Sequence, residues 1–291
     1  MHDAAHTAAT TTQLNLSGHP MADDIQMSVF KRNNVKVSGN GRQTMLFAHG
    51  FGCDHNMWRY VAPAFENEYR VVVFDNVGAG GSDLSQFNPE KYGTLHGYAQ
   101  DIIEILRATE STGAIFVGHS VSAMIGVLAA IEAPDLFDKL VLVGPSASYI
   151  NDGDYIGGFE RSDIDQMLEF LDTNYLGWSS AMAPAIMGNP GQPALAGELE
   201  NSFCRTDPVI AGHFARTTFL SDLRDDLPKL LVPSLIMQCS DDVIAPEAVG
   251  RHMHAHMRNS SFVQLKATGH CPNLSAPEET IAEIKNYLQH Q

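Results

Sequence analysis

Three residues in separate parts of the 291-residue chain could together perform nucleophilic catalysis: Ser120, Asp242 and His270. A histidine that removes the hydroxyl proton turns a serine into a nucleophile, and a carboxylate that accepts the other ring N–H fixes the tautomer of that histidine. Each of the three residues follows a short apolar run that is typical of a buried strand. Because parallel strands end at one edge of an open sheet, we expect the three side chains to meet there as a catalytic triad.

Ser120 lies where the apolar run 115–117 passes at once into helical spacing from Val121 to Ile131. Such a turn strains the central residue and requires small neighbours two positions away, which here are Gly118 and Ser122. Ser122 departs from the usual G-x-S-x-G pattern, because it adds a β-carbon and a hydroxyl. Taken alone, the motif also fits an ordinary strand, turn and helix with an incidental serine.

A second loop could stabilise the negative charge that forms during nucleophilic attack. The predicted strand 44–48 ends in His49-Gly50-Phe51-Gly52, where glycines allow a backbone amide to approach a ligand. Beside Ser120, the amides of Phe51 and Val121 would form an oxyanion hole. A plain glycine turn is the alternative, but the position between a strand and an expected helix at 57–65 favours the oxyanion hole.

The sequence also has to indicate which aspartate and which histidine complete the triad. Asp241 and Asp242 follow the predicted strand 234–239, and we expect Asp242 to orient the histidine because Asp241 lies nearer the strand. His270 stands in a loop after the predicted strand 261–266. A histidine in such a loop usually has no special function, but three placements of this kind together favour the triad.

The remaining elements alternate between strand and helix, which predicts an α/β fold with a mostly parallel central sheet flanked by helices. We expect further strands at 35–37, 69–74 and 139–144, and helices at 94–106 and 279–288. The glycine-rich loop 75–82 lacks the third glycine of G-x-G-x-x-G, so we expect no dinucleotide and no other cofactor.

The alternation stops between Gly144 and Ser234, where helix starts are expected near Ser162 and at Asp207-Pro208. Helices inserted between strands of an open sheet form a lid, which we place at about 147–223. Its apolar residues exceed what isolated helices could hide, so some should line a pocket; they are Phe159, Phe170, Trp178, Met182, Met187, Leu199, Phe203, Phe214 and Phe219.

Charge and cysteine content exclude several classes of function. The formal net charge of −16, with no cluster of lysine and arginine, opposes binding to nucleic acid. The four cysteines have no C-x-x-C spacing, which predicts reduced thiols and a cytoplasmic location. No apolar run approaches the roughly 20 residues that cross a membrane.

The N-terminus and the histidine-rich segments also yield predictions. Residues 1–26 lack hydrophobic periodicity and are expected to be a disordered extension, followed by one domain at 27–291. The tail histidines His2, His6 and His19 should be solvated. His252 and His256 have a spacing seen in zinc sites, and His254 lies between them, but we find no third ligand and expect no metal.

The order of these motifs resembles the α/β-hydrolase fold, from about residue 35 to the C-terminus. The stretch GHSVSAMIG at 118–126, the segment 151–160 and Asn174-Tyr175 are similar to one branch of that family. This branch contains the RsbQ-type bacterial stress-signalling hydrolases and the plant karrikin and strigolactone receptors, and Ser122 also fits it. The resemblance implies a four-helix V-shaped cap over an apolar pocket.

The same resemblance implies which residues surround the ligand beside Phe51: Tyr149, Phe159, Trp178, Met182, Leu199, Phe219 and Ile244. Phe170 and Phe203 are expected to pack between lid helices instead. Met182 and Leu199 stand where some relatives have bulkier aromatic residues, which leaves the ligand open.

Two functions fit this site. The chain could be a serine hydrolase for a small apolar ester or lactone, such as a butenolide. It could instead be an RsbQ-like sensor that binds or slowly hydrolyses a ligand and regulates a partner protein, such as a PAS-domain phosphatase, in sigma-factor stress signalling. A dehalogenase would need aspartate at position 120, and a perhydrolase remains a minor alternative.

Overall fold

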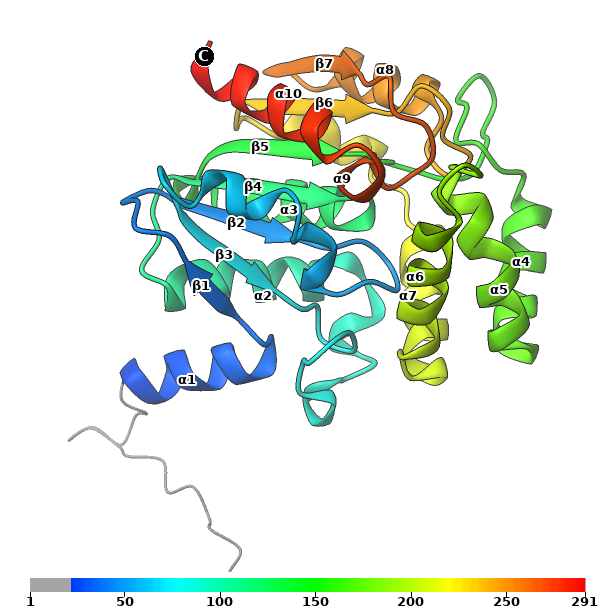
Figure 1. Cartoon of the computed structure of the whole chain (residues 1–291), viewed down its shortest axis with the longest axis horizontal. Coiled ribbons are helices and arrows are strands. Elements are labelled where there is room, and N and C mark those ends of the chain that lie inside the picture. Colours follow the sequence, from blue (N-terminus) through cyan, green and yellow to red (C-terminus); the bar gives the residue numbers. More distant parts are fainter. Residues whose placement is uncertain (1–21, 291) are drawn as a thin grey trace, which may run out of the picture.

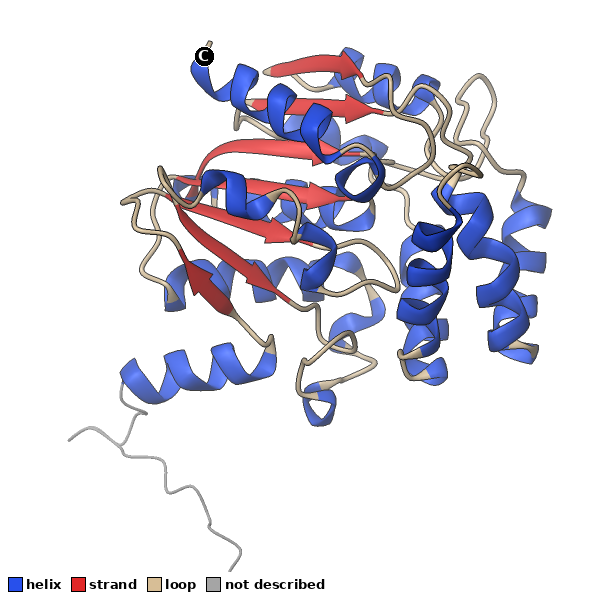
Figure 2. Cartoon of the chain, in the orientation of Figure 1, coloured by secondary structure: helices blue, strands red, loops and turns tan. Residues whose placement is uncertain are grey.

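Seven strands form one twisted sheet, with helices on both of its faces (Figures 1 and 2). The computed structural model describes residues 22–290. The strand order is β1-β3-β2-β4-β5-β6-β7, and every neighbouring pair is parallel except β1 with β3. The strands are β1 (Lys36–Ser38), β2 (Thr44–Ala48), β3 (Arg70–Phe74), β4 (Ala114–His119), β5 (Phe137–Val143), β6 (Ser234–Gln238) and β7 (Ser260–Gln264).

The central strands are apolar on both sides because alternate residues face opposite layers of helices. Leu46, Phe116 and Leu142 belong to one buried cluster, while their neighbours such as Phe47 and Val117 belong to the other. Helices that contribute to the first cluster are α1 (Ala22–Arg32), α2 (Leu95–Ala108), α3 (Val121–Glu132) and α8 (Glu247–His256). The second cluster is covered by α9 (Pro272–Ser275) and α10 (Pro277–Gln289), together with short 3-10 helices.

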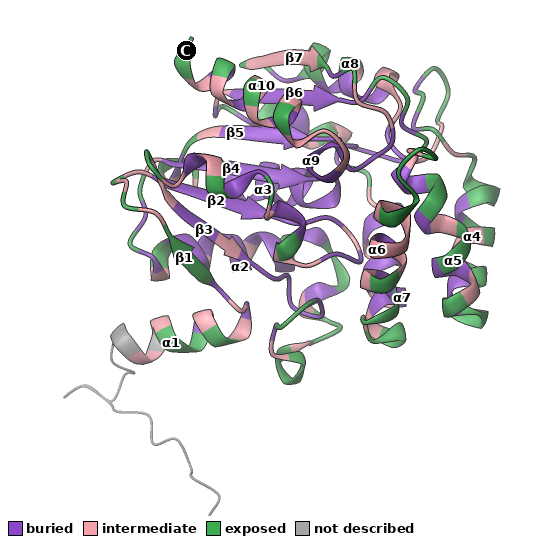
Figure 3. Cartoon of the chain, viewed as in Figure 1, coloured by how far each residue is buried: buried purple, intermediate pink, exposed green. Residues whose placement is uncertain are grey.

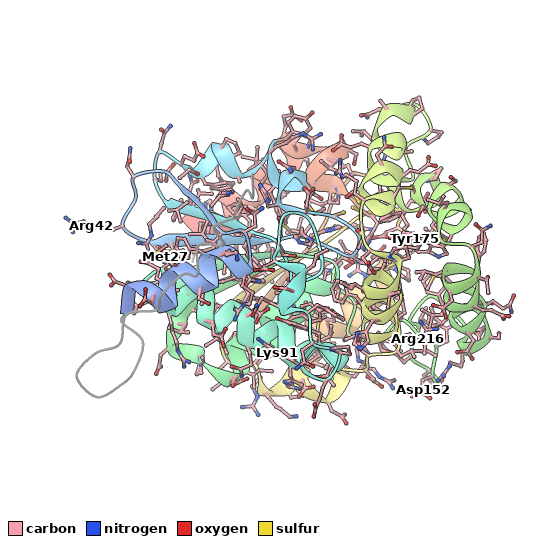
Figure 4. All side chains as sticks on the ribbon, turned by 90° about the horizontal axis from the view of Figure 1, so that it is seen from below. Met27, Arg42, Lys91, Asp152, Tyr175 and Arg216 are labelled. Carbon is pink, nitrogen blue, oxygen red and sulfur yellow. The ribbon has the colours of Figure 1, made fainter. Side chains whose placement is uncertain are left out.

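Four helices between β5 and β6 form a cap at the end of the sheet toward which the parallel strands point (Figure 1). They are α4 (Arg161–Thr173), α5 (Tyr175–Met187), α6 (Pro193–Cys204) and α7 (Pro208–Phe219), and α4 packs on α5 and α7 while α5 packs on α6. The chain leaves and returns at adjacent points, since the Leu223 amide donates to the Ala147 carbonyl over 2.8 Å. In Figure 4, Tyr175 and Arg216 of the cap lie on the side away from Arg42.

The sheet and the outer surface of the cap differ in how far their residues are buried. The strands are largely buried, whereas the outer faces of the cap helices are exposed (Figure 3). Phe170 of α4 is exposed, while Trp178 of α5 and Phe203 of α6 are fully buried. The cap therefore turns most of its large aromatic side chains toward the sheet.

Several local predictions were wrong. The helix expected at 57–65 is instead two 3-10 helices, His55–Trp58 and Ala62–Phe65, because the Asp54 cap starts a turn early and Pro63 prevents a continuous helix. The capping box of α4 joins Glu160 and Asp163 and does not start at Ser162. Helix α1 begins at Ala22, inside the stretch assigned to the extension, and residues 1–21 lie outside the described part of the chain.

Candidate active site

Ser120 occupies a strained turn between β4 and α3. Its φ and ψ are 56° and −125°, a conformation that a non-glycine residue adopts at a cost of about 1–3 kcal/mol. The Ser120 amide donates to the Val143 carbonyl over 2.8 Å, which holds the turn against β5. The hydroxyl therefore stands at the carboxyl end of the sheet, where ligands bind in open α/β folds.

The glycines of the elbow mark where its two elements come closest. A β-carbon on Gly118 would lie 2.6 Å from the ring of Phe116 and 2.7 Å from the Ser122 carbonyl oxygen. A β-carbon on Gly126 would lie only 2.1 Å from the same ring. The close approach thus falls at positions 118 and 126, which explains why position 122 accepts a serine.

Ser122 gives the elbow a polar link to the neighbouring loop. Its buried hydroxyl donates to the His49 carbonyl over 2.5 Å and accepts from the Asn76 amide nitrogen over 3.2 Å. His49 begins the loop that carries Phe51. The departure from G-x-S-x-G therefore connects the serine turn to the predicted oxyanion loop, a contact that the motif alone did not reveal.

A continuous chain of hydrogen bonds joins the serine, the histidine and the carboxylate. His270 Nε2 lies 2.7 Å from Ser120 Oγ, and His270 Nδ1 lies 2.7 Å from Asp242 Oδ2. An ionised carboxylate can only accept, so Nδ1 carries the proton and Nε2 is free to accept from the serine hydroxyl. All three residues are buried, with exposed fractions of 4–6%.

Asp242 is held in its ionised form by its neighbours. Burial raises the pKa of this carboxyl, but the charge and hydrogen bond of His270 and the amides of Ala245 and Ile244 outweigh burial, so the net pKa is lowered. The two amides donate to Oδ1 over 3.1 and 2.8 Å. The Asp241 side chain is exposed, although its carbonyl accepts from the Gly269 amide and so supports the His270 loop.

The backbone amides of Phe51 and Val121 make no hydrogen bond within the described part of the chain. Val121 is the first residue of α3, so its N–H has no partner within that helix. Within residues 22–290, neither amide donates to a backbone or side-chain acceptor. Such free donors beside a serine nucleophile suit a developing oxyanion.

Aromatic side chains from the cap surround the Phe51 ring. Trp178 and Phe219 lie 5.9 and 6.0 Å from it, measured between ring centroids, and Tyr149 lies 5.1 Å from Phe219. Burial raises the pKa of the Tyr149 hydroxyl, and a weaker hydrogen-bond interaction with Ser120 acts in the opposite direction. The structure thus brings Tyr149 close to the predicted nucleophile.

The other predicted pocket residues belong to the same apolar cluster. Leu199 and Ile244 are buried, while Phe159 and Met182 are partly buried and pack against it. Phe203 of α6 packs on Trp178 of α5, with ring centroids 5.2 Å apart, as expected for contact between cap helices. Its ring lies 6.2 Å from Phe51 and also covers Gly52, whose absent side chain leaves the necessary space.

A groove of about 470 Å³ lies elsewhere, between α7 and the start of α2. His96, Leu128, His213, Arg216 and Leu220 are among the residues that line it. It includes none of the predicted site residues.

Among the described residues, the other histidines considered from the sequence form no metal site, and the buried cysteines are not reactive thiolates. His252 and His256 stack with ring centroids 4.0 Å apart, and the described residues contain no group of three side chains suited to hold a metal ion. Burial raises the pKa of the Cys53 thiol to about 12 and also raises that of the Cys271 thiol well above its usual range, so neither is a thiolate near neutral pH. Each helix from residue 22 to 290 is too short or too polar to span a bilayer.

Comparisons with known proteins agree with this geometry. Residues 45–284 match the model of the Alpha/beta hydrolase family. The chain is 42% identical to Karrikin insensitive 2 receptor CA of Petunia hybrida over 90% of this chain and 97% of that one, and 39% identical to Strigolactone esterase RMS3 of Pisum sativum over 89% and 94%. A solved hydrolase from Oleispira antarctica superposes with a TM-score of 0.89 and 40% identity, covering 91% of this chain and 98% of that one.

Proposed function

Because the chain belongs to the alpha/beta hydrolase family, we propose that it is a serine hydrolase that cleaves a small apolar ester or lactone, such as a butenolide. The observation that carries this proposal is the unbroken hydrogen-bond chain from Ser120 through His270 to Asp242. The esterase and hydrolase names among its relatives support the same class of reaction.

In the proposed reaction, His270 Nε2 takes the hydroxyl proton while Ser120 Oγ bonds to the substrate carbonyl carbon. The amides of Phe51 and Val121 hold the resulting oxyanion, and Asp242 stabilises the imidazolium. His270 then returns the proton to the leaving oxygen as the carbon–oxygen bond breaks, which leaves an acyl group on Ser120. A water molecule, deprotonated by His270, attacks that acyl group; the bond from the acyl carbon to Ser120 Oγ then breaks as His270 returns the proton to Oγ, and the acid leaves.

The residues of the cap account for the choice of substrate. An apolar group bound beside Ser120 would be enclosed by Tyr149, Phe159, Trp178, Met182, Leu199, Phe219 and Ile244. Apart from Tyr149, these side chains offer few polar atoms, so a compact apolar acyl or lactone ring fits better than a charged substrate.

The test is hydrolysis of p-nitrophenyl acetate and of a fluorogenic butenolide by the wild-type protein and by Ser120→Ala. We expect the variant to keep its circular dichroism spectrum and to lose at least about 1,000-fold in kcat, because only weak oxyanion-hole catalysis would remain. Mass spectrometry of the wild type with the butenolide should detect the acyl group on Ser120. Wild-type turnover by Ser120→Ala would refute the assignment.

The sensor alternative predicts ligand binding without appreciable turnover. The relatives include proteins named as a receptor and as an esterase, and the hydrolase names favour catalysis. A signalling partner such as a PAS-domain phosphatase remains a prediction of the resemblance alone. Stabilisation by the butenolide in a thermal melt, with no product formed over many hours, would support the sensor instead.

A further inference from the structure

His119 precedes the predicted nucleophile and contacts two other parts of the site. It is the last residue of β4, and only 2% of it is exposed. Its Nε2 lies 2.7 Å from the backbone carbonyl oxygen of His270, and the two imidazole rings lie 5.0 Å apart. The side chain therefore lies directly behind the residue proposed to act as the general base.

The hydrogen bond fixes the tautomer of His119. A carbonyl oxygen can only accept, so Nε2 must carry the proton and donate it. The neutral ring then leaves Nδ1 as a bare acceptor, and this buried atom has no hydrogen-bond partner among residues 22–290. A buried polar atom without a partner is unfavourable, which suggests that the ring has a purpose beyond filling space.

The opposite edge of the ring rests on the oxyanion loop. A β-carbon on Gly50 would lie 2.5 Å from His119 Nδ1, 3.1 Å from its Cε1 and 3.3 Å from the β-carbon of Ser120. Gly50 immediately precedes Phe51, one of the proposed oxyanion donors. The imidazole and the Ser120 β-carbon thus both lie against Gly50, with no room for a larger residue at position 50.

The charge of His119 also matters, because His270 becomes positive during the proposed reaction. Burial, and after it the neighbouring His270, lower the pKa of His119 to about 3. Asp242 acts in the opposite direction and His49 in the same one, both more weakly. His119 is therefore neutral at the pH of ordinary assays and adds no repulsion to the imidazolium.

We propose that His119 is a positioning residue for ester hydrolysis, an inference that rests on the proposed function. Its N–H holds the backbone of His270 so that Nε2 stays in line with the Ser120 hydroxyl. Its ring lies against Gly50 and so supports the loop that carries the Phe51 amide. One side chain thus fixes the general base and the oxyanion loop relative to the nucleophile.

A matched pair of variants tests the hydrogen bond. His119→Gln keeps an N–H donor at a similar reach, whereas His119→Leu removes it. We expect His119→Leu to lower kcat for p-nitrophenyl acetate by about 10–100-fold with KM within about twofold, because small misplacements of reacting groups cost up to about 100-fold. His119→Gln should recover most of that loss. Equal loss in both variants, or wild-type kcat in His119→Leu, would overturn the role of the hydrogen bond.

Gly50→Ala tests the contact between the ring and the loop while keeping histidine at position 119, and it serves if His119→Leu does not fold. The added methyl group should push the loop from the ring and lower kcat by at least about fivefold, with the urea midpoint recorded as a control; an unchanged kcat would overturn the role of this contact.

A further measurement separates this proposal from the proposed function. The NMR chemical shifts of the His270 ring carbons, recorded without substrate, should move in His119→Leu but return toward the wild-type values in His119→Gln. If the wild type hydrolyses no ester, the proposed function fails, yet this measurement still reports whether His119 positions His270. Identical His270 chemical shifts in all three proteins would overturn the positioning role.

Discussion

Replacing Asp242 with asparagine should disable the proposed general base while keeping nearly the same shape. In the structure, Oδ1 accepts from the amides of Ile244 and Ala245, and Oδ2 accepts from His270 Nδ1. An asparagine oxygen that keeps the two amides turns its NH₂ group toward His270. Nδ1 must then accept, so the ring proton moves to Nε2, which can no longer take the proton of Ser120.

The opposite orientation of the asparagine is no better. It would keep the bond to His270 but point the NH₂ group at two buried amide donors. Leaving buried donors unsatisfied costs about 1–3 kcal/mol each, which favours the first orientation. We therefore expect kcat to fall by about 10⁴-fold, the loss known for the wrong tautomer in serine protease triads and equivalent to about 5.5 kcal/mol of barrier.

The assay is kcat and KM for p-nitrophenyl acetate between pH 6 and 9, with circular dichroism and urea unfolding to check the fold. Asp241→Asn is the matched control, since its side chain is exposed and its structural bond comes from the backbone. The control should stay within about twofold of wild type. A loss below about tenfold in Asp242→Asn, or an equal loss in Asp241→Asn, would refute the argument from tautomers.

Four further predictions rest on other contacts. Ser122→Ala should reduce the free energy of unfolding by about 1–3 kcal/mol in urea, because two buried hydrogen bonds are lost and the His49 carbonyl and the Asn76 side-chain amide keep only their longer mutual bond of 3.4 Å; an unchanged midpoint would contradict this. Burial raises the pKa of Asp75, but the hydrogen bond from His55 and weaker partners outweigh it and lower the pKa to about 2. The ionised carboxylate therefore contributes about 2 kcal/mol to the free energy of unfolding above pH 3.8, and this contribution should be lost as pH falls toward 2. The pKa of His55 is raised mainly by its hydrogen bond to Asp75. The stabilisation of the fold by protonated His55 is present below pH 6.5 and should be lost as pH rises through the folded pKa. In urea unfolding at a series of pH values, His55→Gln should abolish this loss. Phe219→Ala should shift the kcat/KM profile from acetyl toward octanoyl esters by about 1–3 kcal/mol in discrimination, and an unchanged profile in a folded variant would place this ring outside the pocket.

Residues whose local pattern determines their position were predictable. The sheet followed from apolar runs with β-branched residues, and the contact between Asp242 and His270 followed from two loops after adjacent parallel strands. Strand ends converge at one edge whatever the details of packing, so the chain order of the loops was enough. The seven-stranded sheet with its inserted cap confirms the predicted fold.

Contacts between residues far apart in the chain were not predictable in this way. Phe203 covers Gly52 about 150 positions away, and no local periodicity indicates which face of α6 meets which loop. The sequence shows Ser122 only as a departure from G-x-S-x-G, whereas in the structure its hydroxyl bonds to His49 and Asn76. Glu160 caps α4 through a reciprocal capping box with Asp163. Several polar residues near this helix start could have been the cap, and the sequence alone does not indicate which one is.

The position of the cap and the geometry of the oxyanion loop are coupled through α6. Ser202 Oγ donates to the Gly52 carbonyl over 2.8 Å, and Glu198 pairs with Arg59 at two points. The ion pair is about a third exposed and worth about 0–1 kcal/mol, whereas burial of the Phe203 ring on Gly52 is worth about 1.5–3 kcal/mol. Apolar packing is thus the larger contribution. Lifting α6 would expose Phe203 and remove a support of the loop that carries the Phe51 amide, so the proposed oxyanion hole depends on the packing of the cap.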